Sequence, residues 1–247
     1  QKIISEVVRQ VQEDFRSDLI ESGGKLNIII TEGLFVEKIQ ENLSRLTQSS
    51  IKPLLNLSGT ILHTNLGRAL LPKEAVEAMT QVATQASNLE FNVEKGGRDN
   101  RDEHVEEDLC HFTGSEAACI VNNNAAAVML VLNTLARRKE VIISRGELVE
   151  IGGLFRLPDI MKAAGCKLKE VGTTNRTYLK DFEDEVSVRT GLIFKAYTSN
   201  YNISGFTKEV RETDLVRLGK EKGVPFVVDV GSGSLTSFKD DNLTIDA

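Results

Sequence analysis

Apolar residues recur at about every fourth position in the first part of the chain, which predicts two amphipathic helices. The first pattern consists of Ile3, Val7, Val11, Phe15 and Leu19, set among charged and amide side chains. The second consists of Val36, Ile39, Leu43 and Leu46, and it ends before a polar stretch and Pro53. Gly23-Gly24 separates the two patterns. We therefore predict a helical arm and linker over residues 1–52 and a larger domain over residues 53–247.

From about residue 115 the pattern changes, and short apolar runs alternate with helical stretches. The predicted strands are Ala118–Val121, Val141–Ser144, Leu168–Val171, Leu192–Ala196 and Phe226–Val230. The predicted helices between them are Ala125–Arg137, Glu147–Ala164, Leu179–Val186 and Val210–Lys222. Such alternation predicts an α/β fold, with a largely parallel sheet covered by flanking helices. Ligands of these sheets bind beyond the carboxyl ends of the strands, so the residues that follow each run are the candidates for chemistry.

The turn Asn122–Ala127 opens an apolar helix directly after the first predicted strand. A helix start offers unpaired N–H groups and a positive end, and the alanines leave room for a phosphate to approach. The same asparagines could simply cap the helix, and the motif alone favours neither interpretation. The sequence has no Walker-type Gly-Lys-Ser/Thr, and Gly231-Ser232-Gly233-Ser234 lacks the third glycine of a dinucleotide fingerprint. Classical nucleotide binding is therefore disfavoured.

Asp229 ends an apolar strand, where a carboxylate is costly unless a cation meets it. A protonated ring nitrogen would serve, as in pyridoxal phosphate enzymes, where an acid stabilises the pyridinium charge. Alternatively, Asp229 could cap the following Gly-Ser turn through an Asx hydrogen bond. The residue by itself leaves both interpretations open.

Composition excludes several classes of protein and leaves a globular domain as the expectation. The chain has 247 residues, 40% hydrophobic positions and a formal net charge of −6, so it can bury a sizeable core and has no overall attraction to nucleic acid or anionic membrane. An RNA partner is neither indicated nor excluded. Cys110, Cys119 and Cys166 are odd in number and widely spaced, as in a protein with reduced thiols. No run approaches the ~18 apolar residues of a membrane span, and we expect a cytoplasmic protein.

Histidine and arginine residues offer further candidate chemistry. The three histidines do not have metal-ligand spacing with the cysteines, so we predict no metal site. Arginines lie in two segments rich in glycine and polar residues, Leu62–Ala69 and Gly96–Arg101. Such arginines suit a bidentate grip on phosphate or carboxylate, although segments of this kind are more often surface loops.

Six segments, in order along the chain, resemble the bacterial selenocysteine synthase family, the L-seryl-tRNA(Sec) selenium transferases. They are Leu62–Ala69, Val121–Val128, Ser144–Gly153, Glu170–Thr177, Thr198–Thr207 and Asp229–Leu235. The resemblance extends from about Leu54 to Leu235. It implies the large domain of a fold-type I pyridoxal phosphate enzyme, and a ring-shaped homo-oligomer with active sites at subunit interfaces.

The resemblance also implies roles for particular residues. Asn123, Asn124 and Ala125 would bind the cofactor phosphate, and Asp229 would pair with the pyridine nitrogen. Asn200 would lie near the phenolic oxygen of the cofactor. Together with the bare chemistry of the turn and of the acid, these roles favour pyridoxal phosphate over a nucleotide.

The implied reaction converts seryl-tRNA(Sec) to selenocysteinyl-tRNA(Sec) with selenophosphate, through loss of the serine hydroxyl and addition of selenium. Arg68 would meet the anionic selenium donor from a neighbouring subunit. Arg98, Arg101 and Arg176 are weaker candidates for contact with phosphate.

The chain departs from the family pattern at the Schiff-base lysine, which the family carries in a later Ser-Gly-Asp-Lys-like segment. The sequence has no such segment. Lys239 follows Asp229 by only ten positions, whereas a parallel crossover needs about a dozen residues or more, and Lys195 lies inside a predicted strand. We therefore expect a domain truncated before that lysine and inactive alone. The alternatives are a related lyase that acts on a free amino or sugar acid, and a non-catalytic scaffold subunit.

Overall fold

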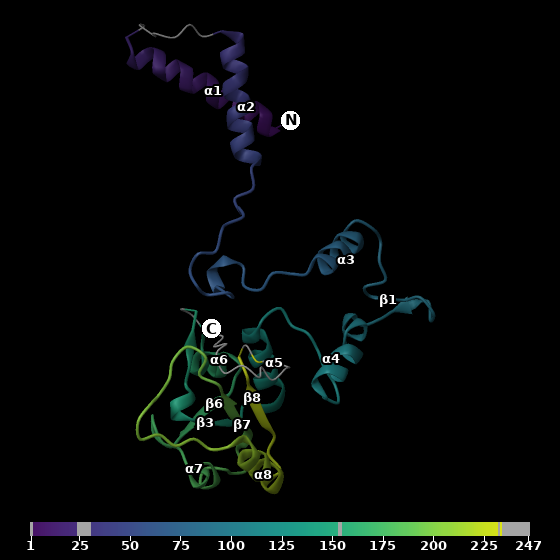
Figure 1. Ribbon diagram of the computed structural model, residues 1–247, viewed down its shortest axis with the longest axis vertical. Helices are drawn as coiled ribbons and strands as arrows, with labels where there is room; N and C mark the ends of the chain where they lie inside the picture. The colour runs from purple at the N-terminus through teal and green to yellow at the C-terminus, as the bar shows by residue number, and fades with distance from the viewer. Residues whose placement is uncertain (1, 24–30, 153–154, 232, 234–247) are drawn as a thin grey trace. The chain divides into compact units, whose positions relative to one another are not determined.

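The computed structural model describes residues 2–23, 31–152, 155–231 and 233 (Figure 1). The contacts divide the chain into two compact units, Gln1–Leu57 and Ser58–Ala247. Lys239 and Ser232 lie outside the described residues. No helix in the described ranges is long and apolar enough to cross a membrane.

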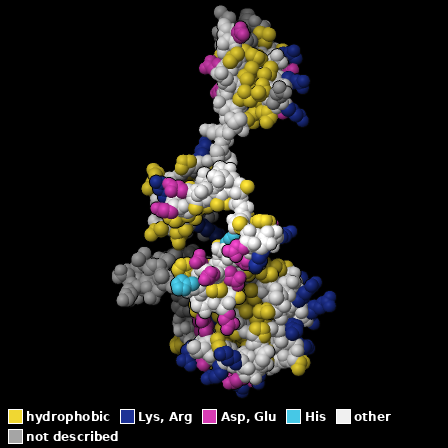
Figure 2. All heavy atoms as spheres, turned by 90° about the vertical axis from the view of Figure 1, so that its right-hand side faces the viewer, with side chains coloured by type: hydrophobic (Ala, Val, Ile, Leu, Met, Phe, Trp, Pro, Cys, Tyr) yellow, Lys and Arg dark blue, Asp and Glu magenta, His cyan; other side chains and the backbone are white. Residues whose placement is uncertain are grey.

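The first unit is a pair of packed helices, α1 (Lys2–Glu21) and α2 (Glu32–Thr47), as the apolar spacing predicts. Val7 and Val11 are buried, and the rings of Phe15 and Phe35 lie 6.0 Å apart between centroids. The hydroxyl of Thr31 accepts a hydrogen bond from the amide of Leu34 and caps α2. Figure 2 shows hydrophobic side chains gathered on one face of this unit.

The second unit begins with short elements that bury few residues. They are the 3-10 turn η1 (Thr64–Leu66), α3 (Lys73–Ala83), the antiparallel pair β1 (Phe91–Asn92) and β2 (Gly97–Arg98), η2 (Arg101–His104) and α4 (Glu106–Thr113). The described residues between 58 and 114 are exposed or half-buried, so this part has no core of its own.

A four-stranded parallel sheet forms the centre of the second unit and confirms the predicted fold class. In chain order its strands are β3 (Glu140–Ser144), β6 (Lys167–Val171), β7 (Thr190–Ala196) and β8 (Phe226–Asp229), and they lie side by side in the order β6-β3-β7-β8. The helices that flank it are α5 (Asn124–Ala136), α6 (Leu157–Ala163), α7 (Leu179–Glu183) and α8 (Glu212–Lys222). Every residue of β7 is buried, as expected of a central strand.

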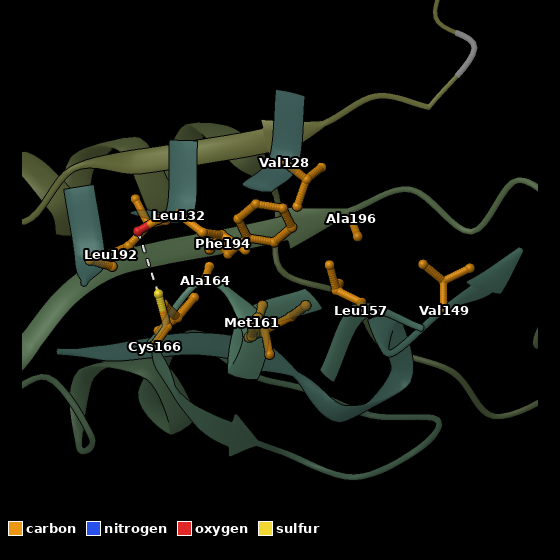
Figure 3. Packing of buried hydrophobic residues seen from close by; sticks show 13 residues of the cluster. Val128, Leu132, Val149, Leu157, Met161, Ala164, Cys166, Leu192, Phe194 and Ala196 are labelled. Atoms are coloured by element: carbon orange, nitrogen blue, oxygen red, sulfur yellow. Dashed lines mark hydrogen bonds between the residues drawn. The ribbon is translucent and has the colours of Figure 1, made fainter. Parts of the chain in front are cut away.

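Two apolar layers cover the two faces of the sheet. On one face, side chains of α5 and α6 pack against Leu192 and Phe194 of β7 (Figure 3). On the other face, α7 and α8 pack against Ile193. The Cys166 thiol is buried in the first layer and lies 3.4 Å from the Leu132 carbonyl oxygen, and burial raises the pKa of this thiol. The alternation of Leu192, Ile193 and Phe194 between the layers is the two-residue period of a strand.

Two of the predicted elements are wrong. Ala118–Val121 belongs to no helix or strand, and Ile120 is exposed. Apolar β-formers need a neighbouring strand to pair with, and the described sheet offers this run none. The predicted helix Glu147–Ala164 is instead η3 (Arg145–Glu147), an antiparallel pair of β4 (Glu150–Ile151) and β5 (Phe155–Arg156), and the short helix α6. The helix starts late because Pro158 favours the first turn of a helix and disrupts its interior.

Candidate functional site

The start of α5 forms one wall of the candidate site. Asn123 is the N-cap residue, and its side-chain oxygen accepts a hydrogen bond from the amide of Ala126 at 2.8 Å. The capping interpretation of the turn is therefore realised. The amides of Asn124 and Ala125 lie in the first helical turn, where N–H groups have no partner within the helix. A capped helix start can still bind an anion, because the cap uses only one of these donors.

Asp229, at the end of β8, faces the start of α5. The side-chain amide of Asn124 donates to both carboxylate oxygens, at 3.0 and 3.2 Å, and the amide of Gly231 donates to Oδ1 at 2.9 Å. The bond from Gly231 is the Asx turn that the sequence allows. Beside the carboxylate, a hollow of about 120 Å³ is lined by residues of α5, β7 and β8, among them Val128, Phe194 and Asp229.

The chemistry of Asp229 fits the pyridine nitrogen of the predicted cofactor. Its carboxylate is half-buried and accepts hydrogen bonds from neutral groups alone, since no lysine or arginine of the described residues forms an ion pair with it. These hydrogen bonds leave the carboxylate without a neutralising cation, and a protonated ring nitrogen would supply one. The residues on this wall therefore fit the cofactor.

The loop after β7 lies next to the loop after β8. A methyl group placed on Gly231 would lie 3.9 Å from the Cβ atom of Ser199, so the two loops run close together there. Asn200 follows Ser199 and is exposed, and its side-chain amide donates to the Glu150 carbonyl at 2.8 Å. The structure thus brings the loop of Asn200 beside Asp229, with one amide hydrogen of Asn200 already in use.

The candidate arginines differ in whether their guanidinium groups already have ion-pair or hydrogen-bond partners. Arg68 follows η1, is exposed and has a left-handed backbone (φ 61°), and its guanidinium forms no ion pair within the described ranges. Arg98 and Arg101 both pair with Glu90. Arg176 donates from Nε to the Phe206 carbonyl at 3.0 Å. Arg68 is therefore the one of these four whose guanidinium has neither an ion pair nor a hydrogen bond among the described residues.

Sequence reasoning missed a buried ion pair between Glu147 and Lys195. Lys195 Nζ lies 3.1 Å from Glu147 Oε1, and the two side chains are only 7% and 11% exposed. Burial raises the pKa of the Glu147 carboxyl, and the charge of Lys195 opposes that rise. A lysine between Phe194 and Ala196 in an apolar strand requires an acidic partner, and this was the available signal.

Lys195 is not directed toward the candidate cofactor wall. Phe194 and Ala196 belong to the apolar layer under α5, so Lys195 points to the opposite face, as Ile193 does. Asp229 lies on the α5 face, two residues after Val227, which packs into that layer. The two faces of the sheet thus separate Lys195 from Asp229, which supports its rejection as the cofactor-bound lysine.

Gly146 shows how tightly the segment before Glu147 is packed. A Cβ atom at Gly146 would lie 2.5 Å from the Thr174 carbonyl oxygen, too close for any real contact. We expect Gly146→Ala to lower the free energy of unfolding by about 1–3 kcal/mol, measured by chemical denaturation, because backbone must move to admit the methyl group. Gly97→Ala is the control, since nothing lies within 4 Å of its Cβ position. Equal effects of the two substitutions would contradict the packing at Gly146.

Comparison with known proteins identifies the family. The model of the L-seryl-tRNA selenium transferase family matches residues 54–246. The chain belongs to this family. The L-seryl-tRNA(Sec) selenium transferase of Proteus mirabilis is 49% identical over 237 residues, which cover 96% of this chain and 50% of that protein. The enzyme of the same name from Haemophilus ducreyi is 56% identical over 197 residues, or 80% of this chain and 43% of that protein. The chain thus spans about half the length of these relatives.

A solved structure supports the fold. D-glucosaminate-6-phosphate ammonia-lyase superposes with a TM-score of 0.58 at 17% identity, over 70% of this chain and 48% of that one. This likeness shows a shared fold. Membership of the L-seryl-tRNA selenium transferase family and the parallel sheet together confirm the predicted fold-type I architecture and pyridoxal phosphate as the cofactor of the family.

Proposed function

We propose that this chain forms part of the cofactor site of an enzyme that converts seryl-tRNA(Sec) to selenocysteinyl-tRNA(Sec) with selenophosphate. The observation that carries the proposal is the hydrogen-bonded pair of Asn124 and Asp229, which joins the start of α5 to the end of β8. The pair places a helix start suited to phosphate beside a carboxylate suited to a pyridinium nitrogen. Family membership supplies the substrate class.

The residues of this wall would have distinct tasks. Asn123 holds the helix start in place, and the amides of Asn124 and Ala125 donate to the cofactor phosphate. Asp229 would accept a hydrogen bond from the protonated pyridine nitrogen and so stabilise its positive charge. When bound, the cofactor supplies an electron sink that stabilises negative charge at the α-carbon of the seryl group.

Asn200 and Arg68 would act on other parts of the same site. An amide carries two N–H hydrogens, so Asn200 can donate to the phenolic oxygen with one and retain its bond to Glu150 with the other. Arg68, with its guanidinium free of described ion pairs, would bind the oxygens of selenophosphate from a neighbouring subunit of a homo-oligomer. The enzyme would work in the cytoplasm, where its tRNA substrate is charged.

We further propose that the lysine that binds the cofactor lies outside these 247 residues. In support, Lys195 is engaged with Glu147 on the opposite face of the sheet. Spectral titration with pyridoxal phosphate tests this proposal. We expect the full-length protein to develop a visible absorbance band that substitution of the later lysine abolishes, and we expect none from this chain alone. A stable band from the chain alone, lost on Lys195→Ala, would show that Lys195 is the cofactor lysine.

An activity assay tests the substrate. The full-length protein is incubated with selenophosphate and either seryl-tRNA(Sec) or free serine, and selenium in the tRNA fraction is measured. The proposal expects incorporation with seryl-tRNA(Sec). Elimination from a free amino or sugar acid without activity on the tRNA would favour a related lyase, and absence of any activity together with absence of cofactor binding would favour a scaffold subunit.

A further inference from the structure

Glu147 makes two directional contacts with the end of β7. Its Oε1 accepts a hydrogen bond from Lys195 Nζ at 3.1 Å, and its Oε2 accepts one from the Ala196 amide at 3.2 Å. All three groups are buried. A carboxylate is one of the few side chains that can accept from a strand amide and a lysine at once, because it offers two charged oxygens.

The residues on either side of Glu147 hold the loop that follows β7. The hydroxyl of Tyr201 donates to the Gly146 carbonyl at 2.6 Å, and the side-chain amide of Asn200 donates to the Glu150 carbonyl at 2.8 Å. The segment Gly146–Glu150 therefore contacts β7 and its loop at four points. Loops at the carboxyl end of a sheet are usually more mobile than the strands, and these contacts restrain this one.

The end of β7 in turn holds the backbone of Asp229. Ala196 and Asp229 are partners in the parallel register of β7 and β8, and the amide of Tyr197 donates to the Asp229 carbonyl at 3.0 Å. Ala196, whose amide binds Glu147, is thus adjacent to Tyr197, whose amide binds Asp229. On the opposite side of the sheet, Asn124 orients the carboxylate of the same residue. Glu147 and Asn124 restrain Asp229 from the two faces.

We propose that Glu147 is a positioning residue, which fixes the backbone of Asp229 through Ala196 and Tyr197 and so sets where the carboxylate meets the cofactor. The proposal rests on the proposed role of Asp229. Replacing a buried ion pair by apolar residues is often neutral or stabilising, so stability alone does not explain a charged pair in this strand. Besides Lys195, the charged or titratable groups near Glu147 are Glu209, 3.8 Å from Lys195 Nζ, and the Tyr197 and Tyr201 phenols.

The test compares Glu147→Gln with Glu140→Gln in the full-length protein. Glu140 is a matched control, because its side chain is 12% exposed, it pairs with Arg189 at 3.1 Å, and it lies at the amino end of β3, away from Asp229. Hydrogen exchange of the Tyr197 amide is measured without cofactor, and the dissociation constant for pyridoxal phosphate is measured by titration. We expect Glu147→Gln to speed the exchange and weaken binding, each by about tenfold, and Glu140→Gln to do neither.

Each outcome decides one question. Unchanged exchange at Tyr197 in Glu147→Gln would overturn the inference, and so would equal effects in the two variants, which would reveal a general loss of stability. If Glu147→Gln does not fold, Glu147→Asp keeps the charge but shortens the side chain by one methylene, and the same acceleration is expected. If exchange accelerates while neither Glu147→Gln nor Asp229→Asn changes cofactor binding, then Glu147 does position the strand end, and the role proposed for Asp229 is wrong.

Discussion

Asp229→Asn is expected to lower kcat of the full-length enzyme by on the order of 10²–10³-fold, the usual cost of losing one preorganised electrostatic contact to a reacting group. The variant keeps a side-chain oxygen for Asn124 and for Gly231, so the local hydrogen bonds can persist. It loses the negative charge that would hold a proton on the pyridine nitrogen, and with it the stabilisation of charge at the α-carbon. Steady-state formation of selenocysteinyl-tRNA gives kcat, and circular dichroism checks the fold.

Asp214→Asn provides the control for this substitution. Asp214 lies on α8 and accepts hydrogen bonds from Arg211 and Arg217, which with Lys208 hold the pKa of its carboxyl below the usual value. Both arginine side chains are largely exposed, so removing this charge is expected to change kcat by less than about twofold. Wild-type kcat and cofactor absorbance in Asp229→Asn would rule out the pyridinium role.

Phe194→Ala is expected to have the largest effect on stability, lowering the free energy of unfolding by about 3–5 kcal/mol. The ring is 1% exposed and lies on β7 within the layer formed by α5 and α6 (Figure 3). It also lines the hollow beside Asp229, so the cavity left by its removal would open next to the candidate site. Chemical denaturation followed by circular dichroism measures the change.

Phe206→Ala is the matched control for the loss of a phenyl ring. Phe206 is 83% exposed, and the Arg176 guanidinium lies 5.9 Å from its ring centroid. Its removal is expected to cost less than about 1 kcal/mol. A cost for Phe194→Ala as small as that for Phe206→Ala would mean that the layer under α5 is not the core of this unit.

The strands were predictable because buried strands of a parallel sheet consist of consecutive apolar residues. Val141–Ser144 and Leu192–Ala196 match β3 and β7 to within two residues at each end, and both are buried. The two long helices of the first unit were predictable from their four-residue spacing. Local pattern suffices where burial alone decides the structure.

The remaining features depend on contacts between distant residues. In the sequence, Glu147 has the pattern of an acidic first helical turn. Its partner Lys195 lies 48 positions later, and the pairing of β3 with β7 brings the two side chains together. Ala118–Val121 has the composition of a strand, but strand formation also requires an available neighbour. The segment containing Arg68 carries a family motif, whereas its short elements give no periodic signal. The sequence pattern therefore predicted the start of α5 and Asp229 as site residues, but it did not predict the ion pair of Glu147 and Lys195.

The bond between Asn124 and Asp229 also bears on how the protein folds. The two residues are 105 positions apart, and their bond connects α5, the first of the helices that flank the sheet, to β8, the last described strand of that sheet. Closing so long a loop is slow, because its entropy is lost before the contact is gained. The helix start can form early during synthesis, whereas its acidic partner arrives only after β3, β6 and β7 have been made. A ligand that needs both residues would bind only to chains in which β8 has joined the sheet, and by mass action it would draw folding intermediates toward that state.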